Sequence, residues 1–72
     1  MTKKRLKTNI IDILDAYTPL IGGVPLQMLE YHLTMNPYTR VDATREEIGE
    51  ALSELLQEKR ISRDVVAYKL EE

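Results

Sequence analysis

The hydrophobic pattern of this 72-residue chain predicts an α+β domain in which three helices precede a short C-terminal β-hairpin. Apolar residues recur at helical spacing in three segments, residues 6–17, 25–35 and 45–58. Beyond residue 59 the period changes to the alternation that is typical of strands. A chain of this length forms one domain with a small core, and the absence of cysteine excludes disulfides as a source of stability.

The first helix is predicted over residues 6–17, where one apolar stripe consists of Leu6, Ile10, Ile13, Leu14 and Tyr17. Thr18-Pro19 is expected to end this helix, because the residue before a proline is disfavoured in α geometry. Leu20 and Ile21 are then candidates for a short strand at a sheet edge, and Gly22-Gly23 permits a turn with positive φ.

The second helix is expected to open at Pro25, which suits the first helical position, and to stop at Asn36-Pro37. It carries two neighbouring apolar stripes, one of Leu26, Leu29 and Leu33 and the other of Met28, Tyr31 and Met35. This apolar surface is wide for a short helix, so it is either well buried or faces a partner. If the second stripe is exposed, we expect self-association into a homodimer.

The third helix has the strongest sequence signal in the chain. After a loop from Asn36 to Thr44, the sequence Thr44-Arg-Glu-Glu47 is a capping box that starts a helix over residues 45–58. Its inward face is predicted to hold Ile48, Leu52, Leu55 and Leu56, with Ala51 at the margin. Two short strands, residues 60–62 and 65–70, are then expected to join near Arg63-Asp64.

Charge is distributed unevenly along the chain. Residues 1–7, which we call the basic arm, hold four of the ten basic residues, namely Lys3, Lys4, Arg5 and Lys7. Residues 8–72 form the predicted domain and hold all twelve acidic residues. Such asymmetry predicts an arm that contacts either a polyanion or the acidic body of its own chain. A solvated leader that aids solubility is the simpler alternative.

Three helices followed by a β-hairpin in about 65 residues resemble a winged helix-turn-helix domain. The segment from Thr44 to Ser62, a capped helix that leads into a strand, is similar to the third helix and first wing strand of that family. The resemblance implies that the third helix enters the major groove of DNA. It also implies groove-facing positions at Arg45, Glu46, Gly49, Glu50 and Ser53, with Arg63 at the tip of the wing.

The third helix departs from this family pattern in its charge. Residues 45–58 contain five glutamates and one arginine, whereas duplex DNA binds chiefly through neutralisation of its phosphates. Three modes of DNA contact stay open: the basic arm in a groove, two arms aligned by a dimer, or a separate basic strip. That strip would consist of Arg40, Arg45, Arg60, Arg63 and Lys69, unless these residues are solvated or paired with glutamates.

No constellation typical of an enzyme is found in the sequence. His32 is the only histidine, and no pattern places Ser53 or Ser62 beside it, so we expect it to be a packing residue. Glu46, Glu50, Glu54 and Glu58 form an acidic ridge that lacks the mixed loop ligands of a calcium site. Gly22-Gly23 is too short to cradle a phosphate. We therefore expect no catalysis, no metal and no cofactor.

The sequence thus supports two hypotheses for a soluble, cytoplasmic module without a membrane segment. In the first, a transcription-regulatory or DNA-handling protein, associated with the nucleoid, contacts double-stranded DNA through seven basic residues: Lys3, Lys4, Arg5, Lys7, Arg40, Arg45 and Arg63. In the second, the chain binds a protein partner and needs no nucleic acid. The contact residues are then Glu46, Glu50 and Glu54 of the acidic ridge, with Tyr31 and Tyr38 as aromatic anchors.

Overall fold

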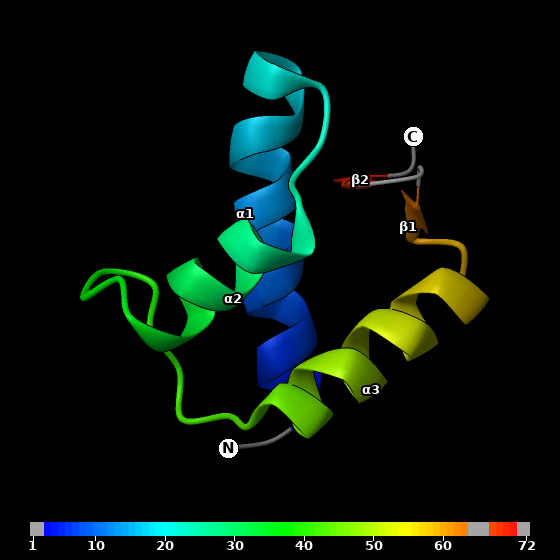
Figure 1. Ribbon diagram of the computed structural model, residues 1–72. Coiled ribbons are helices and arrows are strands. Elements are labelled where there is room, and N and C mark those ends of the chain that lie inside the picture. Colours follow the sequence, from blue (N-terminus) through cyan, green and yellow to red (C-terminus); the bar gives the residue numbers. More distant parts are fainter. Residues whose placement is uncertain (1–2, 64–66, 71–72) are drawn as a thin grey trace.

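The computed structural model describes residues 3–63 and 67–70, and it confirms the predicted α+β class. Three helices precede two antiparallel strands along the chain (Figure 1). The helices are α1 (Lys3–Ile21), α2 (Leu26–Thr34) and α3 (Arg45–Gln57), and the strands are β1 (Ile61–Arg63) and β2 (Tyr68–Leu70).

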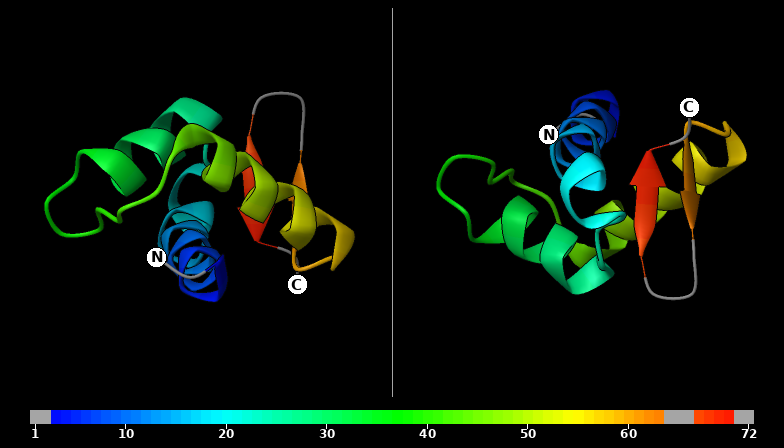
Figure 2. Two further views of the ribbon diagram at one scale, coloured as in Figure 1. Left: turned by 90° about the horizontal axis from the view of Figure 1, so that it is seen from below. Right: turned by 90° about the horizontal axis from the view of Figure 1, so that it is seen from above.

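Helix α1 lies at the centre of the core. Its predicted apolar stripe is confirmed, since Leu6, Ile10, Ile13 and Leu14 are buried and Tyr17 is half-buried. The helix packs against α2, α3 and β2, so the three other parts of the core all contact α1. Figure 2 shows the loop after α2 and the β-hairpin on opposite sides of the helices.

The predicted ends of α1 were wrong. The helix begins at Lys3 rather than Leu6, and it continues through Thr18-Pro19 to Ile21. Pro19 lies in the last turn, where its missing N–H removes only one helical hydrogen bond. The N–H of Gly22 donates to the carbonyl of Thr18 at 2.8 Å and closes this turn, and Gly22 has the expected positive φ of 81°. Leu20 and Ile21 are consequently helical and form no strand.

Helix α2 begins one residue later than predicted, because Pro25 is its extended N-cap residue. Leu29 and Leu33 of the first apolar stripe are fully buried, as expected for a core face. In the second stripe, Met28 is half-buried against the core, whereas Tyr31 is 52% exposed and Met35 is 69% exposed. The wide apolar surface of this helix is therefore only partly used by the core.

The capping box at the start of α3 is confirmed. The N–H of Glu47 donates to Thr44 Oγ1 at 3.2 Å, and the N–H of Thr44 donates to Glu47 Oε1 at 2.8 Å. The buried face holds Ile48, Ala51, Leu52 and Leu55. Ala51, expected at the margin, is fully buried, whereas Leu56 is only half-buried.

Strand β1 has the predicted length of three residues but is displaced by one, and β2 begins at Tyr68 rather than at residue 65. Ile61 pairs with Leu70, and Arg63 pairs with Tyr68. Arg63 was expected in the turn but is the last residue of β1, while the predicted strand residues 65–66 and the turn residue 64 lie outside the described residues. Val24 forms an isolated antiparallel bridge with Tyr68, so the connector between α1 and α2 lies along β2.

Candidate functional site

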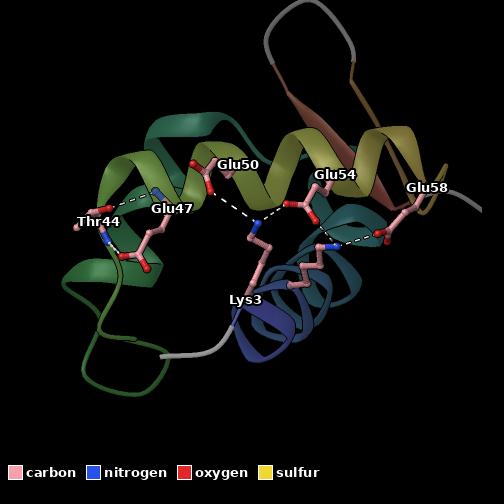
Figure 3. A network of polar contacts seen from close by, with 7 residues as sticks. Lys3, Thr44, Glu47, Glu50, Glu54 and Glu58 are labelled. Carbon is pink, nitrogen blue, oxygen red and sulfur yellow. Dashed lines mark hydrogen bonds and ion pairs between the residues drawn. The ribbon is translucent and has the colours of Figure 1, made fainter.

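The first turns of α1 and the acidic ridge of α3 are joined by ion pairs. Lys3 Nζ lies 2.6 Å from Glu54 Oε2 and 3.7 Å from Glu50 Oε2 (Figure 3). Lys7 Nζ lies 3.0 Å from Glu54 Oε1 and 2.7 Å from Glu58 Oε2. We call these five residues the α1–α3 clasp. Its lysines are four residues apart on one helix and its glutamates four apart on the other, so each set lies on one helical face.

Within the clasp, the pKa values of Lys3, Lys7 and Glu54 are shifted in the direction that favours their charged forms. The hydrogen bond from Lys3 lowers the pKa of Glu54, and Lys7 lowers it further. The hydrogen bond to Glu54 raises the pKa of Lys3, and that to Glu58 raises the pKa of Lys7. The Lys7 side chain is only 14% exposed, against 49% for Lys3, so solvent screens the pairs of Lys7 less.

The clasp places two residues of the basic arm against the acidic body of the same chain. This is one of the two contacts predicted from the charge asymmetry, and it is observed for Lys3 and Lys7. Residues 3–7, assigned to the arm from sequence, belong to α1, and Lys4 is exposed on its first turn. A phosphate that recruits Lys3 or Lys7 must therefore compete with the glutamates of α3.

The other predicted basic residues are distributed over distant elements. Arg45 is the first residue of α3, and Arg63 is the last residue of β1, the strand that follows the other end of this helix. The helix is about 20 Å long at 1.5 Å per residue. Arg45 Nε is 2.9 Å from Glu30 Oε2, and the Arg63 guanidinium lies 5.7 Å from the centre of the Tyr68 ring. Arg45 is therefore paired with a glutamate of α2, which is one of the alternatives predicted for these arginines.

The outer face of α3 combines acidic and small side chains. All five positions that the winged-helix resemblance assigns to the DNA groove are exposed: Arg45, Glu46, Gly49, Glu50 and Ser53. A Cβ atom at Gly49 would meet no atom within 4 Å, so the middle of this face is open. Glu47 is engaged in the capping box, where the Thr44 N–H is the main cause of its lowered pKa.

A groove of about 700 Å³ lies between α1 and the loop that follows α2. It brings together three residues predicted as contacts on separate grounds, Arg5, Arg40 and Tyr38. No α3 residue lines the groove. The remaining lining residues come from α1 and the same loop: Asn9, Asp12, Ile13, Ala16, Tyr17, Thr39, Val41 and Asp42.

The loop wall of this groove is held in place by hydrogen bonds. The Arg40 N–H donates to the carbonyl of Asn36 at 2.8 Å, and the Val41 N–H donates to the carbonyl of Leu33 at 2.8 Å. The Tyr38 N–H donates to Asn36 Oδ1, an Asx turn that leaves the Tyr38 side chain 94% exposed. The loop is therefore an ordered wall that presents an exposed aromatic ring.

His32 packs between aromatic rings, as expected for a structural histidine. It is 6% exposed, and its ring centre lies 5.0 Å from that of Tyr17 and 5.5 Å from that of Tyr31. Asn36 Nδ2 lies 3.0 Å from His32 Nδ1 and satisfies that ring nitrogen. Within residues 3–63 and 67–70, no three acidic or histidine side chains are grouped so that they hold a metal ion.

Sequence reasoning identified the acidic ridge but missed the groove. The lining residues on α1, among them Asn9, Asp12 and Ala16, recur at helical spacing beside the apolar stripe and give a signal for a second face. No sequence signal shows that the loop after α2 lies against this face. Its hydrogen bonds to Asn36 and Leu33 are local, and its position beside α1 depends on how α1 and α2 pack.

The chain has no match among protein-family models, curated proteins or solved structures. In the part of the chain that the structure describes, no helix has the length and apolar character needed to cross a membrane.

Proposed function

We propose that this protein is a small non-enzymatic interaction module of winged-helix-like shape, and that the outer face of α3 contacts a partner protein. The observation that carries this proposal is the exposed acidic surface of Glu46 and Glu50, with the small residues Gly49 and Ser53 on the same helix face. An acidic helix face attracts a basic partner surface and suppresses binding to phosphate. The small residues at its centre permit close approach of the partner.

Photocrosslinking from the centre of this face tests the proposal. A photoreactive amino acid at Ser53 is expected to form an adduct with one protein in cells that express the chain. Glu46→Lys should abolish the adduct, because it reverses a charge on the helix face that carries the crosslinker. Asp15→Lys makes the same change at an exposed site on α1 and should leave the adduct intact. An adduct that survives Glu46→Lys contradicts the proposal.

Duplex DNA binding is the second candidate. It is favoured by the basic side chains of Lys4 and Arg5, which are exposed on the first turn of α1. A salt titration with labelled mixed-sequence duplex DNA tests it, using the native chain and a variant with Lys3, Lys4, Arg5 and Lys7 changed to alanine. Each lost phosphate contact should flatten the log–log slope by about 0.9. Absence of binding at about 50 mM salt rejects this candidate.

A further inference from the structure

We propose that the groove between α1 and residues 36–42 binds an extended peptide segment that carries both an acidic and a basic side chain. This inference concerns a surface separate from the outer face of α3, because no α3 residue lines the groove. It therefore adds a second contact to the proposed function and does not depend on the first.

The shape of the groove suits an elongated ligand. Its α1 wall runs from Arg5 to Tyr17, which spans about 18 Å at 1.5 Å per residue. An extended peptide advances about 3.3 Å per residue, so five or so residues fill this length. The volume of about 700 Å³ is in the range of established ligand sites.

The charges in the groove suit a ligand of mixed charge. Asp12 and Arg40 line the same groove, yet the structure gives neither of them an ion pair within the described residues. Arg40 can bind a carboxylate through two parallel hydrogen bonds, and Asp12 can accept hydrogen bonds from a lysine or arginine. Because Asp12 and Asp42 repel phosphates, the same groove is unfavourable for a nucleic acid strand.

The uncharged lining suits a peptide backbone and one apolar or aromatic side chain. Asn9 is half-buried, and its amide can donate a hydrogen bond to a peptide carbonyl and accept one from a peptide N–H. Ile13 and Val41 provide an apolar floor, and the exposed Tyr38 ring provides a stacking surface at the rim. The groove thus offers a complementary group to each part of a short mixed-charge segment.

A displayed library of random heptapeptides, selected on the full chain, tests this inference. The enriched peptides should carry one acidic and one basic residue at a fixed separation, with an apolar or aromatic residue between them. The binding of an enriched peptide should fall about tenfold or more with Arg40→Glu, since a charge-assisted hydrogen bond is lost. Changing the acidic residue of the peptide to lysine should restore binding to Arg40→Glu.

Two variants and one competing ligand are the controls for this experiment. Arg60→Glu reverses an exposed charge outside the groove and should leave peptide binding unchanged. Glu46→Lys should also leave it unchanged, so failure of the α3 proposal and failure of this one are distinguishable. The inference is overturned if no peptide is enriched or if enriched peptides bind Arg40→Glu as well as the native chain. It is also overturned if single-stranded oligothymidine binds in their place and is lost with Arg40→Glu.

Discussion

Val24 and Tyr68 exchange two backbone hydrogen bonds. The Val24 N–H donates to the Tyr68 carbonyl at 2.7 Å, and the Tyr68 N–H donates to the Val24 carbonyl at 2.8 Å. Both residues are buried, so these bonds lie within the core. They attach the connector between α1 and α2 to β2, which leaves β2 bonded on both sides, to β1 and to Val24. The hairpin is thereby fixed to the helices through main-chain contacts.

Gly23→Ala should destabilise the protein through this connection. A Cβ atom at residue 23 would lie 3.0 Å from the Ala67 Cβ and 3.3 Å from the Tyr68 carbonyl oxygen, so the connector would move away from β2. We expect a loss of roughly 1–3 kcal/mol in the free energy of unfolding, typical of an overpacked site. Urea denaturation followed by circular dichroism measures it. A stability equal to that of the native chain would show that the connector adapts without cost.

Gly49→Ala should have the opposite effect. Gly49 lies within α3, and an added Cβ would meet no atom within 4 Å. Alanine costs less backbone entropy than glycine in a helix, so the free energy of unfolding should rise by about 1 kcal/mol. The same urea experiment measures it. This variant is also the control for Gly23→Ala, because both add one methyl group. A loss of stability would mean that residue 49 requires glycine for a reason not visible in its surroundings.

The parts of the fold that local sequence determines were predicted well. The apolar stripe of α1 and the Thr44–Glu47 capping box follow from residues close together in the chain, and both are confirmed. The end of α1 was not predictable from the residues around Pro19. The helix continues to the hydrogen bond between Thr18 and Gly22, and the Thr18 side chain accepts a hydrogen bond at 3.4 Å from the N–H of Leu70, which is far away in the sequence. The sequence also showed an arm and a ridge of opposite charge, but their alignment depends on how α1 and α3 pack.

Thr44→Ala should remove the cap of α3. The Thr44 side chain accepts from the N–H of Glu47, and without it this donor at the helix start loses its partner in the protein. We expect a loss of about 1 kcal/mol in the free energy of unfolding. Thr44→Ser keeps the hydroxyl and is the matched control. Hydrogen exchange of the amides in the first turn of α3 should accelerate in the alanine variant alone. Equal exchange in the two variants would contradict the role of this cap.

The exposed side chains of Tyr31 and Met35 should support weak self-association. Tyr31 lies in the last turns of α2 and Met35 is the C-cap residue of this helix, so the two exposed side chains form one apolar patch outside the core. Sedimentation equilibrium at rising protein concentration should show an increasing average mass. The double variant Tyr31→Ser, Met35→Ser should remain monomeric over the same range, whereas Leu20→Ser, at an exposed site on α1, should behave as the native chain. A monomeric native chain at high concentration contradicts this prediction.

The α1–α3 clasp should make stability depend on pH at both extremes. The pKa of Glu54 is lowered in the folded protein. Its contribution to the free energy of unfolding is therefore complete above its ordinary pKa of 4.5, and it is lost as the pH falls through the lowered pKa. The pKa of Lys7 is raised in the folded protein. Its contribution to the free energy of unfolding is therefore complete below its ordinary pKa of 10.5, and it is lost as the pH rises through the raised pKa. Thermal unfolding between about pH 3 and about pH 12, a range that extends beyond both ordinary values, measures both limbs.

The variant Lys7→Gln separates the clasp from other titrating groups. It removes the more buried of the two lysines in the clasp, so its stability should change less than that of the native chain across both limbs. Lys4→Gln changes a neighbouring exposed lysine outside the clasp and should retain the native profile. Because the pairs are exposed to solvent, 1 M salt should bring the native profile towards that of Lys7→Gln. Identical pH profiles for the two variants would show that the clasp contributes nothing to stability.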